Sequence, residues 1–180
     1  EVGLAFVPTS LVMMICSLKV SDRLVMAFGI RAPLTVGLVL AAASLGLFAM
    51  APVDGSFGTD VLPSMVLLGV GAGIAFNPVL LAAMGDVEPH EAGLASGVVN
   101  TSFMMGGALG LAVLVAVSDS RTASLTASGS TAVEALHGGL QVAFAVGAVA
   151  AALAAVVGGV FLRPQPMGMP TEVPAHAEHE

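Results

Sequence analysis

Five long apolar segments, none with an acidic or basic residue in its interior, most constrain how this chain folds. They cover residues 2–18, 32–51, 61–84, 92–117 and 140–162. About 20 residues of α-helix cross the roughly 30 Å hydrocarbon core of a bilayer, so the last four are long enough and the first is at the short end. Buried helices of a soluble protein would be shorter or would show a polar face. The pattern predicts an all-α integral membrane protein with five transmembrane helices over residues 1–163.

Composition excludes several other classes of protein. Hydrophobic residues make up 57% of the chain and charged residues 9%, whereas soluble domains carry roughly a quarter charged residues. The five basic residues are dispersed, so no patch suits nucleic acid. The single cysteine, Cys16, permits no internal disulfide. There is no glycine-rich phosphate loop with a lysine, and no cofactor is indicated.

The basic residues predict the orientation in the membrane. Lys19, Arg23 and Arg31 lie between the first two segments and Arg163 follows the fifth, whereas only Arg121 lies on the other side. Because basic residues favour cytoplasmic loops, we expect the N-terminus outside and the C-terminus in the cytoplasm of a plasma membrane. Residues 118–139 then form an external loop that is partly helical, and the proline-rich residues 164–180 a disordered cytoplasmic tail. Since Glu1 lies directly before an apolar segment, we expect a longer native protein.

Polar residues inside the apolar segments are the candidate site residues. Asn77 precedes Pro78, which predicts a helix kink. Asn77 and Asn100 lie at similar depth, roughly 10–12 Å from the cytoplasmic ends of their segments, and are predicted to share one polar layer. That layer either binds substrate or holds helices together. Glycines at helical spacing, such as Gly69, Gly71 and Gly73, favour close helix packing, or alternatively faces that slide during transport.

An enzyme is not predicted. Ser96 and His137 would lie at opposite membrane faces, about 30 Å apart, which is beyond the hydrogen-bond reach of a nucleophile and its base. The segments also lack two histidines at i, i+4, so no metal site is expected there.

The stretch from Ser17 to Pro33 carries the most specific local pattern. It contains Asp22 and Arg23, and then Gly29 and Arg31. We expect a tight cytoplasmic hairpin in which Gly29 permits the turn, and in which Asp22 pairs with a nearby arginine or a helix N-terminus. A plain basic loop that obeys the orientation rule is the alternative.

This Asp-Arg-(x)5-Gly-x-Arg pattern resembles the cytoplasmic signature loop of the major facilitator superfamily. The stretches 3–8, 71–78 and 91–110 are similar to its fourteen-helix drug/proton antiporter branch. The resemblance implies that the chain is a C-terminal fragment forming most of the C-terminal six-helix bundle, in which the first, third and fourth segments line a central cavity. It also implies alternating access, with Asp22, Arg23, Gly29 and Arg31 as a cytoplasmic latch.

One departure concerns the residues after Asn100-Thr101-Ser102. Relatives commonly have Arg-Gln there, whereas this chain has Phe103 and Met104. Met104 either offers an adaptable surface to hydrophobic substrates or simply fills space toward lipid or the core.

The sequence therefore predicts the C-terminal part of a proton-coupled exporter of drugs or hydrophobic metabolites. Its expected partners are the lipid bilayer, a missing N-terminal half, a small hydrophobic substrate and protons. Its expected cavity residues are Phe76, Asn77, Asn100, Phe103 and Met104. The alternative is a membrane module that transports nothing and packs against partner helices.

Overall fold

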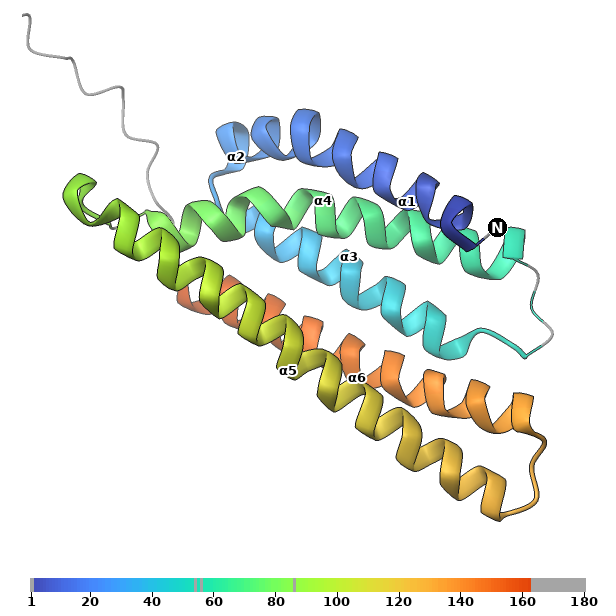
Figure 1. Ribbon diagram of the computed structural model, residues 1–180. Helices are drawn as coiled ribbons and strands as arrows, with labels where there is room; N and C mark the ends of the chain where they lie inside the picture. The colour runs from blue at the N-terminus through green and yellow to red at the C-terminus, as the bar shows by residue number, and fades with distance from the viewer. Residues whose placement is uncertain (1, 54, 56, 86, 163–180) are drawn as a thin grey trace, which may run out of the picture.

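The chain folds into a bundle of helices (Figure 1). The computed structural model describes residues 2–53, 55, 57–85 and 87–162. Two of the short elements, η1 and η2, are π-helical turns, and η3 is a 3₁₀ turn. In chain order the elements are α1 (Val2–Ile15), η1 (Cys16–Ser21), α2 (Asp22–Phe28), α3 (Arg31–Met50), η2 (Phe57–Val61), α4 (Leu62–Met84), η3 (Pro89–Glu91), α5 (Ala92–Ala127) and α6 (Ala132–Phe161).

Four of the described helices, α3, α4, α5 and α6, are long and apolar enough to cross a membrane. The first predicted span is divided between two elements, because α1 has 14 residues and η1 continues it for 6 more. At about 1.5 Å per residue, this continuous helical path comes to about 30 Å, the thickness of a hydrocarbon core. The chain is thus a multi-pass membrane protein.

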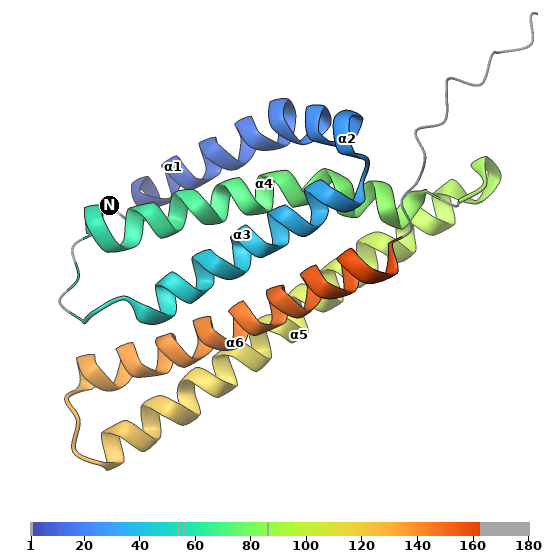
Figure 2. The ribbon, with the colours of Figure 1, turned by 180° about the vertical axis from the view of Figure 1, so that it is seen from behind.

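The helices succeed one another in the order α1, α4, α3, α6 and α5 (Figures 1 and 2). The helix α4 packs between α1 and α3, and α3 packs between α4 and α6. The long hairpin of α5 and α6 closes the series, and α5 contacts α4 only slightly. This arrangement leaves α5 with one well-packed neighbour, α6.

Glycines set the close approach of α4 to its neighbours. A methyl group on Gly71 would lie 2.6 Å from the backbone nitrogen of Ala41 and 2.7 Å from the carbonyl oxygen of Gly37, both in α3. One on Gly73 would lie 2.7 Å from the carbonyl oxygen of Met13. Because helices in lipid associate through close van der Waals contact, these small residues determine which faces of α4 are buried.

Side chains of α6 hold it against α3. The rings of Phe48 and Phe144 stack with centroids 5.2 Å apart. At the C-terminal end of α3, the carbonyl oxygen of Ala51 lies 2.9 Å from His137 Nε2 and accepts a hydrogen bond from Gln141 Nε2 at 3.1 Å. This carbonyl has no helical donor of its own, so the two side chains satisfy it.

Two expected loops are largely helical in the structure. The stretch from Ser17 to Pro33 turns only at Gly29 and Ile30, where Gly29 has φ 73°, a conformation that favours glycine. The expected external loop at residues 118–139 is also helical except around residues 128–131. There Thr131 and Glu134 form a reciprocal capping box that begins α6. The predicted tail, 164–180, lies outside the described residues.

Candidate functional site

A groove lies between α4 and α5. Its volume is about 570 Å³, and an adjoining hollow of about 650 Å³ extends it toward Met13 of α1. The groove is lined by Phe76, Leu80 and Met84 from α4 and by Ser96, Gly97, Val99, Asn100 and Phe103 from α5. The groove forms because α5 packs against α6 and makes few contacts with α4. The helices that border it are those for which the family resemblance implies a place on the cavity.

Two phenylalanines join the walls of the groove. The rings of Phe76 and Phe103 have centroids 6.3 Å apart and meet edge to face at 87°. Such pairs are favourable because the positive ring edge meets the negative ring face. Both rings remain substantially exposed, Phe76 at 40% and Phe103 at 65%. The pair thus offers aromatic surface to an apolar molecule in the groove.

Asn100 gives the groove its amide group. It is exposed and lies one helical turn from Phe103 on α5. Its neighbour Thr101 donates a hydrogen bond to the carbonyl oxygen of Gly97, in its own helix, at 2.8 Å. An amide in an otherwise apolar wall can orient a ligand, since it offers both a donor and an acceptor.

Asn77 and Asn100 do not share a polar layer, contrary to the prediction. Asn77 Nδ2 donates to the carbonyl oxygen of Ser17 at 3.0 Å and to Asp22 Oδ1 at 3.2 Å, so Asn77 faces η1 and α2. Successive residues of an α-helix point about 100° apart, which is why Phe76 lines the groove while Asn77 does not. Similar depth in the membrane did not imply the same face of the helix.

Met104 and Pro78 also lie off the groove. Met104 is 68% exposed and is absent from the described residues that line either hollow. Pro78 is fully buried inside α4, which continues as a helix on both sides of it.

The expected latch residues are spread over α2 and the start of α3. Gly29 and Arg31 line a small hollow of about 300 Å³, together with Gly159 of α6. Asp22 accepts the hydrogen bond from Asn77, and in the part of the chain that the structure describes it forms no ion pair with Arg23 or Arg31. Of the two expected arrangements, pairing with an arginine is thus not found among the described residues, whereas Asp22 does lie in the first turn of a helix, α2.

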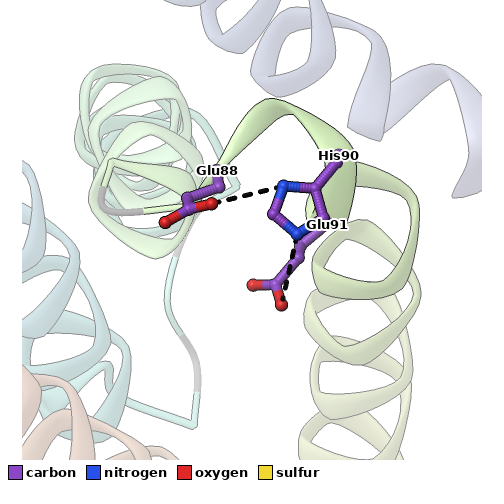
Figure 3. A network of polar contacts seen from close by, with 3 residues as sticks. All are labelled: Glu88, His90 and Glu91. Carbon is purple, nitrogen blue, oxygen red and sulfur yellow. Dashed lines mark ion pairs between the residues drawn. The ribbon is translucent and has the colours of Figure 1, made fainter.

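The turn between α4 and α5 carries a histidine between two carboxylates (Figure 3). His90 Nδ1 lies 3.2 Å from Glu88 Oε2, and His90 Nε2 lies 3.9 Å from Glu91 Oε1. All three side chains are well exposed, so these contacts contribute little to stability. Among the described residues, no group of three or more His, Cys, Asp or Glu could hold a metal ion.

Sequence reasoning missed the contacts that hold α4 against η1. Ser21 is fully buried, and its Oγ donates to the carbonyl oxygen of Ile74 at 3.2 Å. The sequence did offer one signal, because Pro78 has no N–H and so leaves the carbonyl four residues before it, that of Ile74, without its helical donor. What supplies the replacement donor depends on which helix packs there.

Comparisons with known proteins agree with the membrane class that the helices define. The family model of the Major Facilitator Superfamily matches residues 1–111. Puromycin resistance protein pur8 of Streptomyces alboniger is 36% identical over 153 residues, which are 81% of this chain and 30% of that protein. Cephamycin export protein CmcT of Amycolatopsis lactamdurans is 34% identical over 139 residues, 77% of this chain and 28% of that protein. The chain belongs to the major facilitator superfamily.

A third relative is multidrug resistance protein Stp of Mycobacterium tuberculosis, which is 32% identical over 115 residues, 64% of this chain and 21% of that protein. The chain thus spans less than a third of the length of these relatives. No solved structure gives a significant match.

Proposed function

We propose that this chain is the C-terminal part of a proton-coupled transporter that exports drugs or hydrophobic metabolites by alternating access. The observation that carries the proposal is the open groove between α4 and α5, whose walls are apolar and aromatic with one amide, Asn100. Pockets for small apolar ligands have this composition. The relatives whose names describe export or drug resistance support the transport of such compounds.

In this proposal Phe76, Phe103 and Asn100 contact the substrate. The two rings supply apolar and aromatic area, and the amide orients polar groups of the ligand. Asn77 does not contact the substrate in this proposal. It acts indirectly, through its hydrogen bonds to the carbonyl oxygen of Ser17 and to Asp22. Proton coupling and the rocking of two bundles follow from the family resemblance, and the second bundle belongs to the N-terminal half of a longer protein.

The proposed orientation places the α2–α3 turn on the cytoplasmic side of the plasma membrane. Arg23 and Arg31 are exposed at this end, as expected for residues that favour the cytoplasm. Asp22, Arg23, Gly29 and Arg31 then serve as the cytoplasmic latch. No enzymatic step is part of this proposal.

A non-transporting assembly module is the second candidate, because one face of α5 is open. A methyl group on Gly106, Gly107 or Gly110 would have nothing within 4 Å among the described atoms. Small residues on an open face suit the close approach of another helix. The two candidates differ in export activity. A transporter would pack this face against its other bundle and export substrate, whereas an assembly module would export nothing.

The experiment compares Phe103→Ala with Met104→Ala in the full-length protein, with puromycin export from cells as the readout. Phe103→Ala removes a ring from the groove and is expected to weaken export about tenfold, the factor for 1.4 kcal/mol of lost binding. Met104→Ala changes a neighbouring side chain that lies off the groove and should alter export little. Equal effects of the two substitutions would overturn the groove assignment. No export of any tested drug by the full-length protein would favour the assembly module.

A further inference from the structure

A π-helical turn and a proline-containing part of a helix lie against each other in this bundle. The turn is η1, between α1 and α2. The other is the part of α4 around Pro78, which is fully buried. A methyl group on Gly73 would lie 2.9 Å from Cβ of Cys16, so η1 packs directly on α4 here.

In each of these two stretches, a backbone carbonyl accepts a hydrogen bond from a side chain of the other stretch. Because Pro78 has no N–H, the carbonyl of Ile74 lacks its helical donor, and Ser21 Oγ of η1 donates to it at 3.2 Å. In the opposite direction, Asn77 Nδ2 of α4 donates to the carbonyl oxygen of Ser17 in η1 at 3.0 Å. Unsatisfied backbone groups are costly in a membrane, and side chains of neighbouring helices can satisfy those freed by proline. The two stretches therefore stabilise each other.

Asn77 also contacts Asp22, which belongs to the pattern of residues that resembles the signature loop of the family. Asn77 Nδ2 donates to Asp22 Oδ1 at 3.2 Å, at the start of α2. We call Ser17, Ser21, Asp22, Ile74 and Asn77 the polar clasp. Its residue Asn77 follows Phe76, which lines the groove and meets Phe103 of α5. One short piece of α4 thus contacts the groove on one face and the polar clasp on another.

We propose that the π turn and the proline site form one paired hinge, in which Ser21 and Asn77 are positioning residues that couple the groove wall at Phe76 to the Asp22 segment. Wide π turns within helices occur frequently at functional sites. When α4 shifts at Phe76, Asn77 moves with it and either pulls or releases Ser17 and Asp22. The use of this hinge in a transport cycle depends on the proposed function, whereas the coupling itself does not.

The chain's single cysteine, Cys16, is the first residue of the π turn and reports on the hinge. The experiment measures alkylation of Cys16 by N-ethylmaleimide in the full-length protein in its own membrane, quantified by mass spectrometry of the peptide that contains it. Loss of clasp hydrogen bonds in Asn77→Leu or Ser21→Ala is expected to raise the rate about five- to thirty-fold. Ser21→Ala deletes one hydroxyl only, so it carries the test if Asn77→Leu fails to insert.

Ser44→Ala is the matched control. Ser44 Oγ donates to the carbonyl oxygen of Ser64 at 2.6 Å, a buried side-chain-to-backbone bond from α3 to α4 outside the polar clasp. It should leave the alkylation of Cys16 unchanged. If Asn77→Leu and Ser21→Ala behave like Ser44→Ala, the hinge is overturned.

Pro78→Ala tests whether the two stretches are paired. Alanine restores an N–H that can bond the carbonyl of Ile74 and competes there with Ser21 Oγ, which weakens the contact between the two stretches. Cys16 should therefore become more reactive, as in Ser21→Ala. Adding Ser21→Ala to Pro78→Ala should then have little further effect, since both act on the same interaction. Effects that multiply in the double variant would contradict the pairing.

Phe76→Ala tests coupling, which a merely structural role would not produce. It is expected to change Cys16 alkylation severalfold in the wild-type protein and to have no effect in the Asn77→Leu background. The same change in both backgrounds would overturn the coupling. Puromycin export is measured in parallel. A coupled Cys16 response in a protein that exports nothing would refute the proposed function and leave the hinge standing, whereas normal export without coupling would refute the hinge alone.

Discussion

The helices α4 and α5 carry glycines at similar helical spacing, yet the two helices lie in opposite surroundings. Methyl groups on Gly69, Gly71 and Gly73 of α4 would each come within 2.7 Å of an atom of α1 or α3. On α5, methyl groups on Gly93, Gly97, Gly106, Gly107 and Gly110 would have nothing within 4 Å among the described atoms. Of the most apolar stretch of each helix, 39% is buried in α4 and 6% in α5. The same sequence signal thus marks a filled contact in one helix and an open face in the other.

This difference separates two surroundings that glycine spacing alone does not distinguish. In α4 the glycines hold a close contact between helices. In α5 the open face and the groove beside it are free for a ligand, lipid or another bundle. The packed side of the molecule therefore supports the groove, and the open side is where binding is expected.

The largest expected effect comes from leucine at matched glycines of the two helices. Gly71→Leu places a side chain against the backbone nitrogen of Ala41 in α3, so the helices must separate, at a cost of about 1–3 kcal/mol or more. Gly107→Leu points into open space and should change stability by less than about 0.5 kcal/mol. Thermal unfolding of the detergent-solubilised protein, followed by size-exclusion chromatography, measures both.

Equal destabilisation by the two leucines would contradict the assignment of α4 to a packed face and of α5 to an open one. It would mean that the α5 face is packed in the full-length protein by a segment outside the described residues. Export is then measured on Gly107→Leu, because a substitution on a face used only during the transport cycle would lower activity and leave stability unchanged.

The helical class was predictable because the length and apolarity of a span are set by the bilayer, whatever the neighbouring helices are. The stretch 118–139 was predicted less well, since its small polar residues suit a solvated loop and a solvated helix equally. In the structure Gly139 lets α6 approach the carbonyl of Ser118 closely, where α5 is still helical. That contact depends on the tertiary structure.

For the candidate site, the direction in which each side chain points was not predictable. Counting residues from the helix ends predicts a similar depth for Asn77 and Asn100, but only the packing of η1 against α4 shows that Asn77 faces Ser17 and Asp22. Phe76 and Phe103 were expected near the substrate, and the structure brings their rings together. The effect of Pro78 on the carbonyl of Ile74 followed from the chain alone, whereas Ser21 as its donor required the structure.

An intermediate effect on stability is expected when a hydroxyl group is removed from the packed side of the molecule rather than from the open side. Ser44→Ala removes a buried hydrogen bond between α3 and α4 and should cost about 1 kcal/mol of unfolding free energy. Thr101→Ala removes an exposed hydrogen bond within α5, from Thr101 Oγ1 to the carbonyl oxygen of Gly97. That carbonyl remains part of the helix. The expected cost of Thr101→Ala is below about 0.5 kcal/mol. Equilibrium unfolding in mixed detergent gives both values, and a larger loss for Thr101→Ala would reverse the assignment of packed and open sides.

The smallest effect on stability is expected at the turn that joins α5 to α6. The exposed helix α5 packs mainly on α6. The Thr131 side chain accepts a hydrogen bond from the backbone N–H of Glu134, and Glu134 Oε2 accepts one from the backbone N–H of Thr131. Thr131→Ala removes this cap at a cost of about 0.5–1 kcal/mol.

Thr126→Ala is the matched control at the same turn, because Thr126 Oγ1 donates a hydrogen bond to the carbonyl of Thr122 in its own helix. Hydrogen exchange at the start of α6 should increase in Thr131→Ala and stay unchanged in Thr126→Ala, while exchange in α4 stays slow in both. If exchange in α4 rose as well, the hairpin would support the packed side of the molecule, and the two sides could not be treated as independent.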